Sequence, residues 1–161
     1  MEPQRAYVGL GANLGDARAT LQDALRRIAA LPQTQLLRVS SFYRTAPVDA
    51  GGPDFVNAVA ELSTTLQPLA LLRALQAIEL EHGRERPYRN APRTLDLDLL
   101  LHGDTHQADP ALTLPHPRGP QRAFVLRPLA ELAPALGWPG HGPVAALAAA
   151  ITDQPIEKLP P

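Results

Sequence analysis

The sequence predicts an α+β fold: a ferredoxin-like βαββαβ core with one antiparallel sheet, helices on one side of it, and C-terminal additions. Two segments with hydrophobic residues at three- and four-residue intervals predict helices, and they alternate with four segments typical of strands. The chain has 161 residues, 45% of them hydrophobic, which allows a buried core without disulfides, and it contains no cysteine. We expect one domain over residues 1–161, because no repeat or linker divides the sequence.

The first strand leads directly into the first helix. Residues 6–10 form a short apolar run that ends in the glycine-punctuated turn GLGANLGD, where the side chain of Asp16 can cap a helix. Pro32 ends this helix. Its apolar stripe consists of Leu21, Ala24, Leu25, Ile28 and Leu31.

A pair of strands and a second helix follow. Residues 35–45 are rich in β-branched and aromatic residues and predict one strand, and residues 55–63 alternate and predict its antiparallel partner. The turn-rich segment APVDAGGPD joins the two strands. Pro68 suits the first turn of a helix that runs to Gly83. The apolar stripe of this helix consists of Leu71, Leu72, Leu75 and Ile78.

The last core strand is expected at residues 94–101. The two-residue period of a strand places Asp96, Asp98 and Leu100 on one face. The opposite face carries Leu95, Leu97, Leu99 and Leu101. After this strand we expect a short strand near residues 124–126 and small helices at residues 129–133 and 144–151, as additions to the core.

The overall charge excludes several classes of function. The net charge is −1 and the pI is about 6.5, so the protein has no global basic field that would attract nucleic acid or anionic membranes. No apolar run approaches the roughly 18 residues needed to cross a bilayer, and the first residues contain no secretory signal. We therefore expect a cytoplasmic protein that binds neither nucleic acid nor membrane. Four arginines nevertheless fall close together: Arg84, Arg86, Arg89 and Arg93.

Asp96 and Asp98 form a candidate metal site. Their carboxylates project from one strand face with Cα atoms about 6.6 Å apart, and two adjacent negative charges favour a bound cation. Mg²⁺ prefers hard oxygen ligands and completes its shell with water and substrate phosphates. An isolated pair of this kind is more often a solvated strand face. The neighbouring arginines favour a polyphosphate site, because guanidinium groups bind the phosphate oxygens that the metal leaves free.

Three other features each admit two interpretations. His116 lies between prolines and is followed by Arg118 and Arg122, so this restricted loop can bind phosphate or can be purely structural. Gln76 and Glu79 share one helix face, where they can bind the polar edge of a ligand or face water. The glycines of GLGANLG depart from dinucleotide-binding spacing, and no G-x-x-x-x-G-K phosphate loop exists, so any ATP is bound in another way.

Six ordered motifs resemble those of one family. They are GLGANLGD, SSFYRTAPV, DFVNAV, QAIELEHGRER, PRTLDLDLLLHG and LPHPRGPQRAFVLRPL, and PRTLDLD is especially specific. Across residues 6–135 the chain resembles the 6-hydroxymethyl-7,8-dihydropterin pyrophosphokinases of the folate pathway, which pass pyrophosphate from ATP to a pterin alcohol and release AMP. The resemblance implies an enzyme that uses ATP as co-substrate with two Mg²⁺ ions.

The resemblance also implies roles for individual residues. It implies that Asp96 and Asp98 hold the metal. The catalytic groups that it implies are Arg84, Arg93, Asp96, Asp98, His116 and Arg122. The ATP contacts that it implies are Gln76, Glu79, Arg84, Arg86, Arg89, Arg93, Leu99, Thr113, His116 and Arg122. The pterin contacts that it implies are Thr45, Val48, Phe55, Asn57 and Phe124. Phe55 and Asn57 share a strand face, so both can reach one ligand.

We expect the loops at residues 46–53 and 85–91 to close over both substrates and exclude water. We also expect a monomer that acts on small molecules. Two rival functions are a metal-dependent phosphohydrolase, which needs no alcohol acceptor, and a ferredoxin-like RNA-binding module, which needs exposed aromatic residues and basic charge. AMP formed only in the presence of the pterin distinguishes pyrophosphoryl transfer from hydrolysis.

Overall fold

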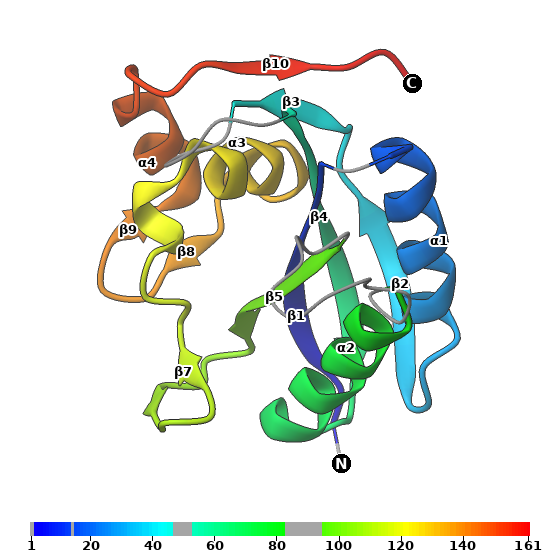
Figure 1. Ribbon diagram of the computed structural model, residues 1–161. Helices are drawn as coiled ribbons and strands as arrows, with labels where there is room; N and C mark the ends of the chain where they lie inside the picture. Colours follow the sequence, from blue (N-terminus) through cyan, green and yellow to red (C-terminus); the bar gives the residue numbers. More distant parts are fainter. Residues whose placement is uncertain (1, 14, 47–52, 83–94) are drawn as a thin grey trace.

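The computed structural model describes residues 2–13, 15–46, 53–82 and 95–161, and an antiparallel sheet forms its centre (Figure 1). The strands of this sheet are β1 (Gln4–Ala12), β2 (Thr34–Val39), β3 (Tyr43–Thr45), β4 (Phe55–Thr64), β5 (Asp96–His102) and β10 (Ile156–Lys158). Their order is β10-β3-β4-β1-β5, and β2 also pairs with β4. The predicted βαββαβ core is confirmed, and the chain then adds β10 at the β3 edge.

Two helices, α1 (Ala17–Ala29) and α2 (Pro68–His82), pack on one face of this sheet, as the sequence predicts. The Asp16 side chain caps α1 by accepting a hydrogen bond of 3.1 Å from the backbone N–H of Ala19. The buried residues of both helices meet β1, β4 and β5 in one hydrophobic cluster; from the helices these are Leu21, Ala24, Ile28, Leu71, Leu75 and Ile78. No helix in the described residues is long and apolar enough to cross a membrane.

The single strand expected at residues 35–45 is wrong, because the chain forms β2 and β3 with a break between them. Ser40 causes the break: its backbone N–H donates to Val59 O at 2.9 Å, and its Oγ accepts from Val59 N–H at 2.9 Å. A side-chain oxygen thus replaces a carbonyl in the strand ladder. The pairing register moves by one residue, from Val39 opposite Ala60 to Tyr43 opposite Asn57.

The expected alternation of β5 is confirmed up to Leu99 and is wrong at Leu101. Leu95, Leu97 and Leu99 belong to the cluster beneath α1 and α2. A bulge then occurs, because Val8 pairs with Leu99 whereas Tyr7 pairs with Leu101. Leu101 therefore joins a second hydrophobic cluster on the opposite face.

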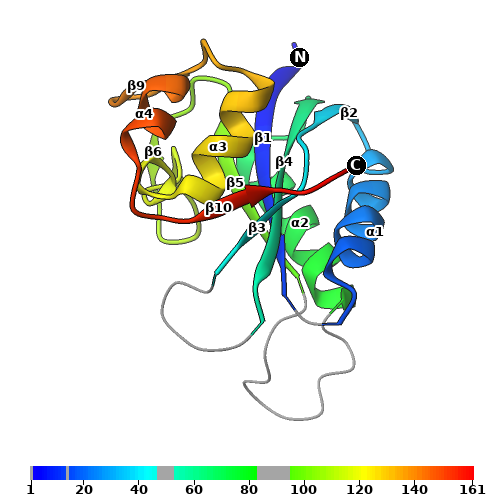
Figure 2. The ribbon, with the colours of Figure 1, turned by 90° about the horizontal axis from the view of Figure 1, so that it is seen from above.

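The C-terminal part of the chain packs against that opposite face, so the sheet lies between α1 and α2 on one side and α3 and α4 on the other (Figure 2). The helices here are α3 (Ala123–Leu132) and α4 (Val144–Ala150). The helix expected at residues 144–151 is confirmed. The shorter elements are β6 (Gln107–Ala108), β7 (Thr113–Leu114), the 3-10 turn η1 (Gly119–Gln121), β8 (Gly137–Trp138) and β9 (Gly142–Pro143).

The strand expected near residues 124–126 is wrong, because these residues begin α3. Val125, Leu129 and Leu132 recur at helical spacing and are buried against the sheet. Residues 124–126 alone look like a strand, whereas the longer window predicts a helix. The small helix expected at residues 129–133 is the second half of α3, which ends at Leu132.

Candidate active site

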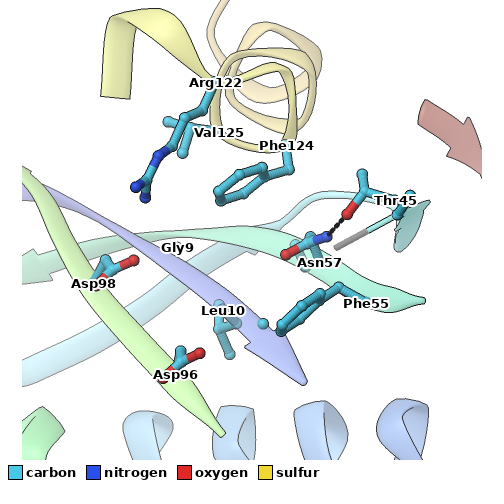
Figure 3. A pocket seen from close by; sticks show the side chains of 13 residues that line it. Gly9, Leu10, Thr45, Phe55, Asn57, Asp96, Asp98, Arg122, Phe124 and Val125 are labelled. Atoms are coloured by element: carbon cyan, nitrogen blue, oxygen red, sulfur yellow. Dashed lines mark hydrogen bonds between the residues drawn. The ribbon is translucent and has the colours of Figure 1, made fainter. Parts of the chain in front are cut away.

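A cavity of about 470 Å³ lies between the N-terminus of α3 and the sheet face opposite α1 and α2 (Figure 3). The strands β1, β4 and β5 form its floor, and β3 and α3 form its walls. Its lining residues are Gly9, Leu10, Gly11, Thr45, Ala46, Phe55, Asn57, Ala58, Asp96, Asp98, Arg122, Phe124 and Val125. Seven of these are residues to which the sequence assigned roles, so the fold brings together segments that lie far apart in the chain.

Asp96 and Asp98 project from β5 into the cavity and are partly exposed (Figure 3). Both carboxylates share one face, as the two-residue period predicts. Their strand is held at its outer edge by α2, because Leu97 N–H donates to Glu79 Oε2 at 2.7 Å. Within the described residues, no group of three or more histidine, cysteine, aspartate or glutamate side chains can hold a metal. The two carboxylates suit a hard cation that takes its other ligands from water or substrate.

The other side of the cavity suits a flat, polar molecule. Phe55 on β4 and Phe124 on α3 face the cavity from different sides (Figure 3). Asn57 is buried between them, and its Nδ2 donates to Thr45 Oγ1 at 2.7 Å. This bond fixes the amide group, and the Asn57 Oδ1 atom lies above Gly11. Two aromatic rings with one fixed amide between them can bind a planar heterocycle and its polar edge.

Arg122 lines the cavity together with the two aspartates, and His116, which is not among the lining residues, lies near enough to Asp98 for that carboxylate to affect its pKa. The Arg122 guanidinium carbon lies 5.3 Å from the centre of the Phe124 ring, so its charge is held at the cavity wall. His116 Nδ1 accepts from the backbone N–H of Arg118 at 3.2 Å. The neutral imidazole therefore carries its proton on Nε2 and can donate it to an anion.

The environment of His116 shifts its pKa. Burial lowers the pKa of the imidazole below its ordinary value, and the charges of Arg122 and Arg118 lower it further. The carboxylate of Asp98 raises the pKa, which opposes these effects without cancelling them. His116 is therefore a mainly neutral hydrogen-bond donor at neutral pH.

The remaining predicted residues lie in several places. Gln76 is exposed on α2, and Thr113 is exposed on β7. Leu99 is buried in the cluster beneath α1 and α2, so its side chain does not reach the cavity and only its backbone can contact a ligand. Five predicted residues lie outside the described part of the chain: Val48, Arg84, Arg86, Arg89 and Arg93. Most of the two predicted lid loops lies outside it as well.

Sequence reasoning missed the role of Gly9 and Gly11. The spacing of the GLGANLG glycines argues against a dinucleotide site, and the structure places Gly9 and Gly11 in the cavity floor opposite Asp98 and Asp96. A Cβ atom on Gly11 would lie 3.0 Å from Asn57 Oδ1. The signal was present in the sequence, because glycine at alternate positions of a strand often marks a close approach of a ligand or another group.

The chain is similar to known proteins of one family. Residues 7–134 match the family model described as 7,8-dihydro-6-hydroxymethylpterin-pyrophosphokinase (HPPK). Over 158 residues the chain is 51% identical to the 2-amino-4-hydroxy-6-hydroxymethyldihydropteridine pyrophosphokinase of Pseudomonas aeruginosa, covering 98% of both chains. Over 157 residues it is 43% identical to the protein of the same name from Haemophilus influenzae, covering 97% of this chain and 98% of the other.

The fold is also similar to that of a solved structure. A crystal structure of Plasmodium falciparum HPPK-DHPS superposes with a TM-score of 0.72 at 12% identity, over 92% of this chain and 45% of the other. At this identity the similarity concerns the fold alone.

Proposed function

Because the chain belongs to the 7,8-dihydro-6-hydroxymethylpterin-pyrophosphokinase family, we propose that its cavity is the place where pyrophosphate passes from ATP to the pterin. The protein is an enzyme of folate biosynthesis that transfers pyrophosphate from ATP to 6-hydroxymethyl-7,8-dihydropterin, giving the pterin diphosphate and AMP. The observation that supports the location is the cavity itself, in which paired carboxylates lie beside an aromatic pocket.

In this proposal, Asp96 and Asp98 would hold two Mg²⁺ ions. Bound Mg²⁺ would neutralise charge on the triphosphate and orient it. The two aspartates are partly exposed and offer carboxylate oxygens on one face of β5, so they can share ligands with water and phosphate. The hydrogen bond from Leu97 N–H to Glu79 keeps this stretch of strand in place.

The pterin lies between Phe55 and Phe124, and Asn57 recognises its polar edge. The Asn57 Nδ2 group donates to Thr45, which sets the orientation of the amide. Its carbonyl oxygen can then accept a hydrogen bond from a ring N–H or amino group of the pterin. The glycines below leave room for the ring. Val48, outside the described residues, would complete this pocket.

The reaction is a direct displacement at the β-phosphorus of ATP. The hydroxymethyl oxygen forms a bond to the β-phosphorus, the bond from that phosphorus to the α,β-bridging oxygen breaks, and AMP leaves. The alcohol proton passes to solvent. Arg122 and the Nε2–H group of His116 stabilise charge on the phosphate oxygens, and Arg84 and Arg93 would act with them. Gln76, Glu79 and Thr113 would contact the nucleotide, and Arg86 and Arg89 would help cover the triphosphate.

Replacing the paired carboxylates tests the metal assignment. We expect Asp96→Asn and Asp98→Asn each to lower kcat at least about a hundredfold, because each removes a charge that binds the metal. Folding should be unchanged, since both side chains face the cavity and not the core. The measurement is steady-state AMP production over a range of Mg²⁺ concentrations. Asp104→Asn is the matched control, because Asp104 is exposed and lies in the turn after β5. Near-parental activity of either cavity variant would refute the assignment.

The assembly and location of the protein remain predictions. We propose one catalytic domain over residues 1–161 that acts as a monomer in the cytoplasm. Sedimentation equilibrium at micromolar concentration measures the mass in solution, and twice the 17.3 kDa of the chain would contradict the monomer.

A further inference from the structure

The N-terminus of α3 is capped by a residue from a distant part of the chain. The backbone N–H of Ala123 donates to Gln154 Oε1 at 2.9 Å, across 31 residues of sequence. Gln154 Nε2 in turn donates to the carbonyl oxygen of Gln121 at 2.9 Å. Arg122, at the usual capping position, makes no side-chain capping bond. One amide group therefore satisfies a donor and an acceptor on either side of Arg122.

The backbone segment that Gln154 bonds, residues 121–123, contains or adjoins two residues of the cavity. Arg122 lies between the two bonded backbone groups, in an extended conformation that links η1 to α3. Phe124 follows two residues after Arg122, and the side chains of Arg122 and Phe124 both line the cavity. A change in the backbone at Ala123 would therefore move the aromatic wall and its neighbouring guanidinium together.

The residues that follow Gln154 are bound to the sheet. Two residues further on, Ile156 pairs with Thr45, the residue that fixes the amide of Asn57. The chain then continues beside β3, where Leu159 N–H donates to Phe42 O at 2.8 Å (Figure 1). Arg18 Nη2 donates to Pro160 O at 2.8 Å. Residues 154–160 thus contact both the α3 wall and the β3 wall of the cavity.

We infer that Gln154 is a positioning residue for the pterin, which acts by fixing the start of α3 so that Phe124 lies at the correct height above the sheet. The inference rests on the proposed function, because it takes the cavity as the pterin pocket. Gln154 touches neither substrate in this account. Its side chain is largely exposed, so its replacement leaves the hydrophobic core intact.

Equilibrium binding tests the inference without turnover. Calorimetry would measure the Kd of 6-hydroxymethyl-7,8-dihydropterin in the presence of Mg²⁺ and α,β-methylene ATP. In this analogue a methylene group replaces the α,β-bridging oxygen, so pyrophosphate transfer cannot occur during the measurement. We expect Gln154→Ala to raise this Kd about five- to tenfold, because it removes two hydrogen bonds that set the geometry of the wall. Gln154→Glu keeps the acceptor for the Ala123 N–H group but loses the donor to the Gln121 carbonyl, so it should restore only part of the affinity. Glu157→Ala, an exposed side chain on the same tail, is the matched control and should bind as the parent does.

A double-mutant cycle separates positioning from general structural support. If Gln154 acts through Phe124, Gln154→Ala should change the Kd by less than twofold when Phe124→Ala is already present. A full five- to tenfold effect in that background would overturn the inference, as would parental affinity of the Gln154→Ala single variant. Parental affinity of Phe124→Ala alone would instead refute the pterin pocket, and the positioning role with it.

Discussion

Asn57 presents a carbonyl oxygen to the cavity because its Nδ2 group is engaged by Thr45 at 2.7 Å. Asp96 and Asp98 point in the same direction because of the two-residue period of β5, which the sequence alone predicts. The alternating glycines at positions 9 and 11 are a sequence signal of a close approach, but their places opposite Asp98 and Asp96 depend on the register between β1 and β5. A local pattern thus predicts which way a side chain points, and pairing determines what lies opposite.

Tyr7 shows how burial and a carboxylate act on one titrating group. Burial, and then the hydrogen bond of 2.6 Å to Glu61, raise the pKa of Tyr7 to about 12. The fold therefore favours the neutral phenol, and the stability that Tyr7 contributes is complete below its ordinary pKa near 10 and is lost as the pH rises through 12.

The Tyr7→Phe variant isolates this transition. We expect the phenolate absorbance titration of the parent, minus that of the variant, to show one ionisation near pH 12. We also expect the free energy of unfolding of the parent to fall relative to the variant between pH 10 and 12. A difference titration centred near pH 10 would show that Glu61 and burial do not act on Tyr7 as described.

At the scale of the element, α3 is fixed to the sheet by contacts that no local pattern reveals. Glu131 near its C-terminal end accepts from Ser41 N–H at 2.9 Å and from Tyr43 O–H at 2.6 Å. These partners lie 90 and 88 residues away, in and beside the break between β2 and β3. The sequence therefore predicts one long strand at residues 35–45, because it cannot show the long-range bonds that favour the break.

The loop between His116 and α3 depends on close packing at Gly119. The ring of Trp138 occupies the space where a Cβ atom on Gly119 would lie. We expect Gly119→Ala to lower the free energy of unfolding by about 1–3 kcal/mol, because the indole ring is buried and cannot move aside without disturbing the second cluster.

Denaturant unfolding measures this effect. Gly137→Ala is the matched control, because a Cβ atom there meets nothing within 4 Å, and it should leave the free energy of unfolding almost unchanged. Equal stability of the Gly119→Ala variant and the parent would contradict the packing argument.

At the scale of the whole molecule, the cavity forms where a βαββαβ core meets its C-terminal additions (Figure 2). The order of helices and strands in the core was predictable because their periods are local properties of the sequence, whereas the break after β2 and the bulge beside β5 were not. The place of α3 at the cavity was not, since it depends on packing against Val59, Leu100 and their neighbours and on hydrogen bonds to distant residues. The aspartates, Phe55 and Asn57 come from the core, whereas Arg122 and Phe124 come from an addition. In the proposed function, both parts are needed to place an acceptor alcohol beside a triphosphate.

The identity of the products tests this account most directly. Phosphorus NMR of the protein with ATP, Mg²⁺ and 6-hydroxymethyl-7,8-dihydropterin should show AMP and the pterin diphosphate in equal amounts, and no AMP when the pterin is omitted. This result follows if one cavity aligns the hydroxymethyl oxygen with the β-phosphorus of ATP. Formation of ADP, or phosphate release that does not depend on the pterin, would contradict it.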